Sequence, residues 1–126
     1  MFEGSCLCGK VTFQVDGPLS NVSACHCGQC RKNSGHHWAS CEAFDADFRI
    51  TSDDTPGWYQ ASADAKRGFC KNCGSFLFWK HLNEDKLSIS MSAFDTPTGL
   101  KLQRHIFVAD KGDYYDIADG LPQKDQ

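Results

Sequence analysis

Seven of the eight cysteines in this chain fall into three closely spaced groups. Cys6 and Cys8 form a C-x-C pair, and Cys70 and Cys73 form a C-x-x-C pair. Between them, residues 25–30 have the sequence CHCGQC, in which three cysteines and one histidine share six positions. Such a segment suits a metal site, a redox pair, a catalytic nucleophile or part of a disulfide framework.

The spacing of these cysteines favours zinc over the other kinds of site. A tight turn lets two nearby thiolates reach one ion. Gly9, Gly28 and Gly74 each directly follow a cysteine of one group, as expected where the backbone turns sharply around a metal. No βαβ pattern surrounds either cysteine pair, so a thioredoxin-like redox motif is disfavoured.

Counting ligands divides the cysteines into two sites. A structural zinc site uses four protein ligands, whereas a catalytic site uses three and leaves the fourth position to water or substrate. The simplest division therefore joins the two pairs into one closed site and leaves the triplet with an open or exogenous fourth ligand. The first site is Cys6, Cys8, Cys70 and Cys73, and the second is Cys25, Cys27 and Cys30.

Other divisions remain open from spacing alone, including the triplet joined to one distant cysteine. The triplet is also compatible with a purely structural site completed by His26, His36, His37 or Cys41. His26 stands between two ligands, where its side chain can point away from the metal. Cys41 lies in an alternating apolar stretch, which is typical of a small buried hydrophobe.

The whole chain sets the context for these sites. Its 126 residues predict one domain with a modest core. A net charge of -3 gives no general reason to bind nucleic acid or anionic membrane. No apolar run approaches the roughly 20 residues of a membrane span, and no signal peptide is visible. A cytoplasmic protein is therefore expected, and in that reducing compartment disulfides are rare.

The apolar pattern predicts short strands. Between residues 10 and 16, Val11, Phe13 and Val15 alternate with polar residues, as in a strand with one buried face. Further strands are expected at 37–44, 48–51, 57–62, 76–79, 86–94 and 104–110. This pattern indicates an antiparallel, mainly β architecture. A short helix or turn is expected over 28–35, and residues 113–123 fit either a helical turn or ordered coil.

Basic residues gather near the cysteines. Residues 17–41 contain Arg31 and Lys32 but no acid, and residues 65–83 contain four basic residues but no acid. A basic neighbourhood would attract an anionic substrate. Equally, nearby cations would offset the negative charge of a metal held by several thiolates.

Four segments carry a family resemblance. GSCLCGKVTF, CHCGQCRKNSG, GFCKNCGSFLFW and HIFVADKGDYYDIADGLPQ occur in that order. Together they resemble the glutathione-dependent formaldehyde-activating enzyme (GFA) family, also called the CENP-V/GFA domain. The resemblance implies one such domain over residues 1–126, with the β-tent fold of antiparallel sheets around zinc.

The resemblance also implies two zinc ions per chain and assigns their ligands. Cys6, Cys8, Cys70 and Cys73 match the structural zinc site, and Cys25, Cys27 and Cys30 match the second, catalytic-type site.

The implied activity is that of a carbon–sulfur lyase which adds formaldehyde to glutathione to give S-hydroxymethylglutathione. The partner is then a small-molecule thiol such as glutathione. A non-catalytic, zinc-stapled binding module is the alternative, because fold does not determine function.

Residues beside the triplet offer further chemistry. His36, His37 and Arg31 are candidates to move protons or hold a carboxylate, although an exposed histidine pair and a solvated arginine are the preferred expectation. A third hypothesis is an enzyme for a different small electrophile or thiol conjugate. Residues 35–38, with the sequence GHHW, could line a pocket for such a molecule.

Overall fold

The computed structural model describes all 126 residues and is built mainly from short strands. Its one α-helix is α1 (Gly28–Ser34), and its three single-turn 3₁₀ helices are η1 (Asp45–Asp47), η2 (Met91–Ala93) and η3 (Val108–Asp110). The strands are β1 (Phe2–Ser5), β2 (Thr12–Val15), β3 (Ser20–Cys25), β4 (Trp38–Phe44), β5 (Phe48–Ile50), β6 (Gly57–Gln60), β7 (Ala65–Phe69), β8 (Phe76–His81), β9 (Lys86–Ser90) and β10 (Arg104–Ile106).

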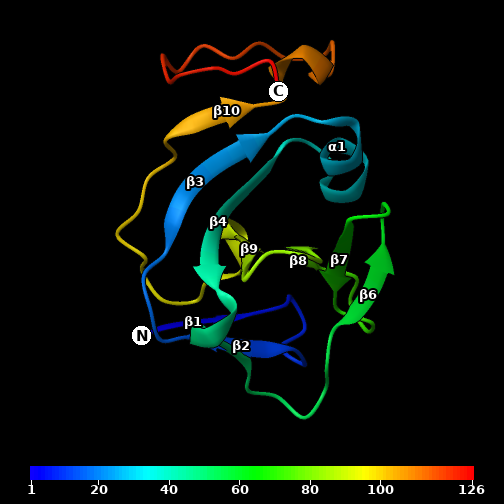
Figure 1. Cartoon of the computed structure of the whole chain (residues 1–126), viewed down its shortest axis with the longest axis vertical. Coiled ribbons are helices and arrows are strands. Elements are labelled where there is room, and N and C mark those ends of the chain that lie inside the picture. Colours follow the sequence, from blue (N-terminus) through cyan, green and yellow to red (C-terminus); the bar gives the residue numbers. More distant parts are fainter.

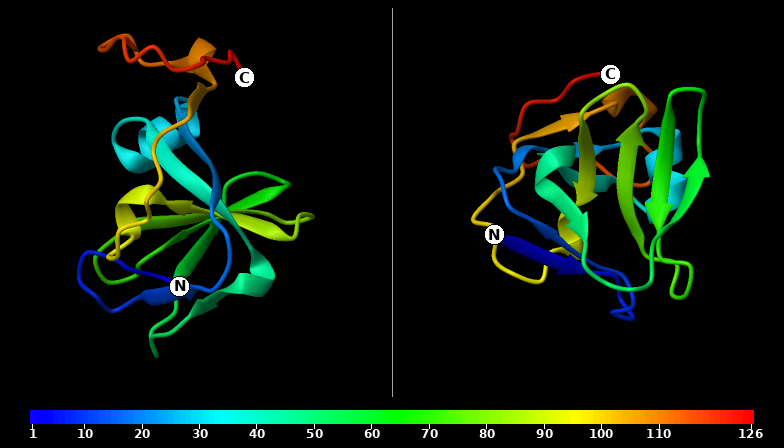
Figure 2. Two further views of the ribbon diagram at one scale, coloured as in Figure 1. Left: turned by 90° about the vertical axis from the view of Figure 1, so that its left-hand side faces the viewer. Right: turned by 60° about the horizontal axis from the view of Figure 1, so that its bottom comes forward.

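These strands form two sheets. The larger has the order β10-β3-β4-β9-β8-β7-β6, and the smaller has the order β1-β2-β5. The small sheet lies at the end of the molecule that carries the N-terminus, and the C-terminal segment crosses the opposite end, beyond β10 and α1 (Figures 1 and 2). The mainly β fold expected from the sequence is confirmed.

One strand pair departs from the expected antiparallel pattern. β10 runs parallel to β3, with Arg104 opposite Ser23 and Ile106 opposite Cys25. β3 and β10 lie far apart in the chain, and the long connection between them is what a parallel pair requires. The C-terminal segment then covers the outer edge of β10, where the N–H of His105 donates to the carbonyl of Pro122. No free strand edge is left beside Cys25.

The main core lies between the two sheets. Val11, Phe13 and Val15 are all buried, as their alternation predicted. The rings of Phe13 and Phe78 meet edge to face with centroids 5.3 Å apart. Cys41 is completely buried in this core, as expected of a small hydrophobe, and burial raises the pKa of its thiol to about 12.

A second, smaller cluster lies apart from the main core. Its buried members are Cys25, Cys30 and Trp38, against which Phe76, Trp79 and Ile106 pack. The ring centroids of Trp38 and Phe76 are 4.4 Å apart. The cysteine triplet is therefore packed against its own apolar cluster.

Most predicted elements are present, and the differences have local causes. The expected strand over 104–110 ends at Ile106, because Phe107 takes a left-handed backbone conformation with φ of 54° and a 3₁₀ turn follows. The strand predicted over 86–94 ends at Ser90, before η2. Residues 113–123 form ordered coil without a helix. Strands β1, β3 and β7 were not predicted.

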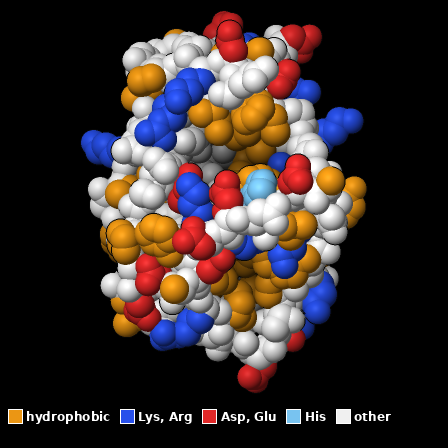
Figure 3. All heavy atoms as spheres, viewed as in Figure 1, with side chains coloured by type: hydrophobic (Ala, Val, Ile, Leu, Met, Phe, Trp, Pro, Cys, Tyr) orange, Lys and Arg blue, Asp and Glu red, His pale blue; other side chains and the backbone are white.

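Acidic and basic side chains are interspersed on the face drawn in Figure 3. None of the helices is long and apolar enough to cross a membrane.

Candidate functional site

The first cysteine group joins the N-terminal turn to the turn between β7 and β8. The Sγ atoms of Cys6, Cys8, Cys70 and Cys73 all lie within 4.8 Å of one another. Two of these separations are 3.5 Å, between Cys6 and Cys8, and 3.8 Å, between Cys8 and Cys70. Tetrahedral zinc with Zn–S bonds of about 2.3 Å needs sulfurs about 3.8 Å apart, so the four thiols fit this ion.

Both turns of this group end at a glycine whose N–H closes the turn, over three positions in the first turn and four in the second. The N–H of Gly9 donates to the carbonyl of Cys6, and the N–H of Gly74 donates to the carbonyl of Cys70. Both glycines have φ of +79°, a left-handed conformation that favours glycine. Gly28 begins α1 instead and is not left-handed, so the sharp turn expected there is wrong.

Backbone donors point at the sulfurs of these turns. The N–H of Val11 lies 3.3 Å from Cys6 Sγ, and those of Asn72 and Cys73 each lie 3.4 Å from Cys70 Sγ. Hydrogen bonds from Ser75 lower the pKa of Cys73 to about 5. These donors favour the thiolate, which is the form that binds metal.

The second group lies where β3 meets α1. Cys25 ends β3, Cys27 is the N-cap of α1, and Cys30 is buried in its first turn. Their three Sγ atoms lie within 4.8 Å of one another. The N–H of Cys30 donates to Cys27 Sγ over 3.3 Å. Hydrogen bonds from the thiols of Cys25 and Cys30 lower the pKa of Cys27. Hydrogen bonds with Cys27 and Cys30, together with burial, raise the pKa of Cys25.

No fourth protein ligand joins the triplet. No histidine nitrogen, carboxylate oxygen or other sulfur lies within 4.8 Å of all three Sγ atoms. The candidates that the sequence left open are placed elsewhere: Cys41 lies in the main core, and His26, His36 and His37 contact the C-terminal segment. Three thiols suit a zinc ion that keeps one position for an exogenous ligand.

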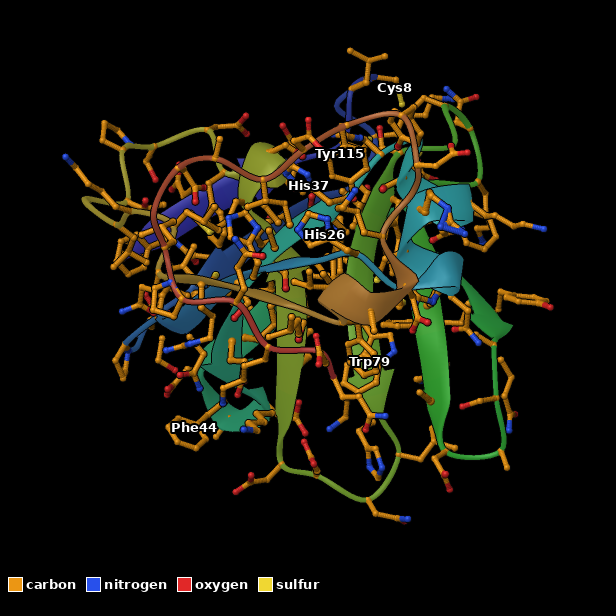
Figure 4. The ribbon with its side chains drawn as sticks, turned by 90° about the horizontal axis from the view of Figure 1, so that it is seen from above. Cys8, His26, His37, Phe44, Trp79 and Tyr115 are labelled. Atoms are coloured by element: carbon orange, nitrogen blue, oxygen red, sulfur yellow. The ribbon has the colours of Figure 1, made fainter.

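His26 belongs to a buried chain of hydrogen bonds rather than to the thiol group. Its Nδ1 is hydrogen-bonded to the hydroxyl of Tyr115, and its Nε2 lies 2.8 Å from His105 Nδ1. His105 Nε2 lies 2.7 Å from a carboxylate oxygen of Asp119. In Figure 4, Tyr115 of the C-terminal segment lies near His26 and His37. When both imidazoles are neutral, every donor in the chain can point from Tyr115 toward Asp119.

Burial determines the charge of His26, whereas a hydrogen bond shifts the pKa of Asp119. His26 is 1% exposed, and burial together with His37 and His105 lowers the pKa of His26 to about 4. His26 is therefore neutral at pH 7. The hydrogen bond from His105 lowers the pKa of the Asp119 carboxyl. This chain anchors the segment between Cys25 and Cys27 to the C-terminal coil.

Three residues in this chain of hydrogen bonds were not predicted as site residues. They are His105, Tyr115 and Asp119. Tyr115 and Asp119 lie in the segment of 113–123 whose conformation the sequence left open. Tyr115 contacts His26, 89 positions away in the sequence, and Asp119 contacts His105, 14 positions away. The only signal was the family-like sequence HIFVADKGDYYDIADGLPQ, which contains all three.

The prediction that His36, His37 and Arg31 are exposed to solvent is wrong. His36 and His37 are half-buried, because Tyr114 and Tyr115 pack over them. His36 Nδ1 lies 2.8 Å from the hydroxyl of Tyr114. Arg31 is also half-buried, and its Nη1 donates to the carbonyl of Asp110 over 2.9 Å. The C-terminal coil thus covers side chains that would otherwise be exposed.

Replacing Asp119 with asparagine tests the negative charge at the end of this chain of hydrogen bonds. The variant keeps an oxygen that can accept from His105 but loses the negative charge. We expect a lower free energy of unfolding than wild type at pH 7. Because the folded-state pKa of Asp119 is lowered, this deficit should be fully present above the unfolded-state value of about 3.9 and should shrink as pH falls through the folded pKa.

Urea unfolding of Asp119→Asn and wild type at matched pH values from 7 to 3 measures this deficit. Asp113→Asn is the matched control, since Asp113 is exposed and forms no side-chain hydrogen bond or ion pair. Equal stability of Asp119→Asn and wild type at pH 7 would show that the contact contributes nothing to folding.

Two cavities flank the triplet. One, of about 460 Å³, is lined by ten residues that include Ser34, His37, Trp38 and Phe76. Two residues of the GHHW segment therefore do line a cavity. The other, of about 280 Å³, lies between α1 and the hairpin of β6 and β7.

Comparison with known proteins identifies relatives along most of the chain. The family model described as glutathione-dependent formaldehyde-activating enzyme matches residues 1–110. An uncharacterised lyase of Schizosaccharomyces pombe is 30% identical over 122 residues, covering 93% of this chain and 85% of the relative. A Halomonas elongata protein, provisionally named a glutathione-dependent formaldehyde-activating enzyme, is 30% identical over 131 residues, covering 93% of this chain and 81% of the relative.

A solved structure has the same fold. The crystal structure of a Rhodobacter sphaeroides protein superposes with a TM-score of 0.63 at 24% identity, covering 75% of this chain and 89% of that chain. The likeness supports the mainly β architecture and carries no information on activity.

Proposed function

We propose a function from one premise: the chain belongs to the glutathione-dependent formaldehyde-activating enzyme family. On this premise it is a zinc-dependent carbon–sulfur lyase of the GFA type. Its reaction is the joining of glutathione and formaldehyde to S-hydroxymethylglutathione, or the corresponding reaction of a related thiol adduct, and the reverse. The S–C bond forms between the thiol sulfur and the carbonyl carbon, and the carbonyl oxygen gains the proton that the thiol loses.

Two zinc ions would have different roles. Cys6, Cys8, Cys70 and Cys73 would hold a structural zinc that ties the N-terminal turn to the turn between β7 and β8. The triplet of Cys25, Cys27 and Cys30 would hold the second. The chemistry that this second zinc would supply is to keep a bound thiol deprotonated at neutral pH.

The single observation that carries the proposal is the open triplet. Three thiols lie within 4.8 Å of one another, and no fourth protein donor completes the set. The aromatic residues Trp38, Phe76 and Trp79 pack against the triplet and would limit water on that side of a reacting thiol. His26 is held through both ring nitrogens and thus orients the loop that carries two of the ligands.

The test is the exchange between free formaldehyde and its glutathione adduct at equilibrium, measured by isotope-exchange NMR. We expect an exchange rate that rises in proportion to the concentration of zinc-loaded protein. A rate that stays at the uncatalysed value would exclude this reaction. If glutathione then also left the metal content and spectra unchanged, a non-catalytic zinc-stapled module would be the better description.

A further inference from the structure

The 280 Å³ cavity beside the triplet has an unusual lining. Three of its residues, Gln29, Lys32 and Asn33, lie on one face of α1, because positions three and four apart on a helix are neighbours. The opposite wall is formed by residues of the β6–β7 hairpin. These are Tyr59, Ala61 and Arg67. The lining therefore holds two cations, two amides and a phenol, but no carboxylate.

Arg67 is the buried member of this lining. It is only 5% exposed and forms no ion pair with an acidic side chain. Its Nη2 donates to Gln29 Oε1 over 3.2 Å and lies 3.7 Å from Cys30 Sγ. Its guanidinium lies over the ring of Phe76, 5.3 Å from the centroid. Its Nε and Nη1 are buried without any hydrogen-bond partner.

The two cations of the lining differ in their surroundings. Arg67 faces the thiols through Cys30, so its charge helps to offset that of a metal held by thiolates. Lys32 is exposed and forms no ion pair with an acidic side chain. Because the lining contains no acid, a bound carboxylate would be the partner of Lys32. It would also lie near the guanidinium of Arg67, a group that recognises carboxylates well.

We propose that this cavity binds a carboxylate of the thiol substrate, so that the enzyme selects thiols that carry an isolated carboxylate over neutral thiols. The inference rests on the proposed function, since the substrate sulfur occupies the open position of the triplet. In glutathione the thiol and the glycine carboxylate are about two backbone residues apart, on the order of 6 Å. Arg67 lies between the two sites, in contact with Cys30 on one side and lining the cavity on the other.

The glycine end of glutathione fits this cavity better than the γ-glutamyl end. The glycine end has a carboxylate alone, whereas the γ-glutamyl end also has an ammonium group. Two lining cations and no acid would repel that ammonium. The glycine carboxylate is therefore the group that Lys32 and Arg67 hold.

The inference is tested by calorimetry, which measures how tightly the zinc-loaded protein binds each of three probes. S-methylglutathione keeps both carboxylates but has a blocked thiol. Glutathione glycyl ethyl ester keeps the thiol but lacks the charge of the glycine carboxylate. Glutathione has both groups. For wild type, we expect saturable binding of S-methylglutathione and weaker binding of the ester than of glutathione.

The variant Lys32→Gln removes the exposed cation without disturbing a buried side chain. It should weaken binding of S-methylglutathione and glutathione about three- to tenfold, and it should leave binding of the ester nearly unchanged. Lys101→Gln is the matched control, because Lys101 is exposed and is not part of the cavity lining. Arg67→Gln, after its folding has been checked by circular dichroism, should also bind S-methylglutathione and glutathione more weakly than wild type does.

The outcomes separate this inference from the proposed function. Equal affinity of wild type for glutathione and its ester, or unchanged binding by Lys32→Gln, would overturn the carboxylate site even if exchange catalysis is present. Binding of S-methylglutathione by wild type that is weakened in Lys32→Gln would support the carboxylate site. It would do so even if the protein does not accelerate formaldehyde exchange.

Discussion

Replacing Cys70 with serine should leave the chain largely unfolded at room temperature. Cys70 is 1% exposed and lies at the edge of the main core, where its sulfur is 3.8 Å from that of Cys8, 62 positions away. A metal at this group closes that long loop, and closing long loops contributes most to folding. Structural zinc supplies about 10–16 kcal/mol of binding free energy, which is comparable to the whole stability of a small domain, about 5–15 kcal/mol.

Circular dichroism melts and zinc content measure this effect. We expect Cys70→Ser to lose the cooperative transition and its structural zinc. The matched control is Cys41→Ala, which removes a buried cysteine that belongs to neither group and should keep the wild-type zinc content. If Cys70→Ser melted like wild type and retained two zinc ions, the structural role of this group would be wrong.

Replacing Cys25 with serine should have the opposite profile. The triplet lies within residues 25–30, so a metal there closes only a short loop and stabilises the fold little. β3, which ends at Cys25, is also held by its pairing with β4 and β10. We therefore expect Cys25→Ser to lose one zinc ion and the formaldehyde–glutathione exchange activity, while the cooperative melt remains.

Zinc content, melting temperature and NMR exchange rate, measured on one preparation of Cys25→Ser, test this profile. Exchange at the wild-type rate with one zinc ion per chain would show that the triplet does not carry the reaction. A variant that unfolds as completely as Cys70→Ser would show that the roles of the two groups were assigned the wrong way round.

The two cysteine groups could be predicted because metal binding depends on how closely the cysteines follow one another in the sequence. Both cysteine groups follow from closely spaced cysteines and ligand counting, and the structure brings their sulfurs within metal-binding distance. Strands with an alternating apolar face, such as β2, were predictable for the same reason, because periodicity is a local signal.

The remaining elements were hidden because their burial depends on distant partners. β3 has the polar sequence SNVSAC, yet it pairs with both β4 and β10, and its Val22 is buried in the main core. β7 contains a buried arginine, which no apolar pattern reveals. Both of these strands serve the site, since β3 delivers Cys25 and β7 delivers Arg67.

The hydrogen-bond chain was hidden for a similar reason. His26 and Tyr115 are 89 positions apart, and His26 and His105 are 79 positions apart. Their contact requires the parallel pairing of β10 with β3, which the expected antiparallel pattern did not include. The burial of His36 and His37 depends on the same C-terminal segment.

The most direct test of the open triplet is a crystal structure of the zinc-loaded protein grown with glutathione, with anomalous data at the zinc edge. We expect a zinc ion bound by Cys25, Cys27 and Cys30, with the glutathione sulfur as its fourth ligand. The glycine carboxylate should lie in the cavity between Lys32 and Arg67. A protein side chain at the fourth position, with glutathione bound nowhere near the metal, would contradict the proposed lyase.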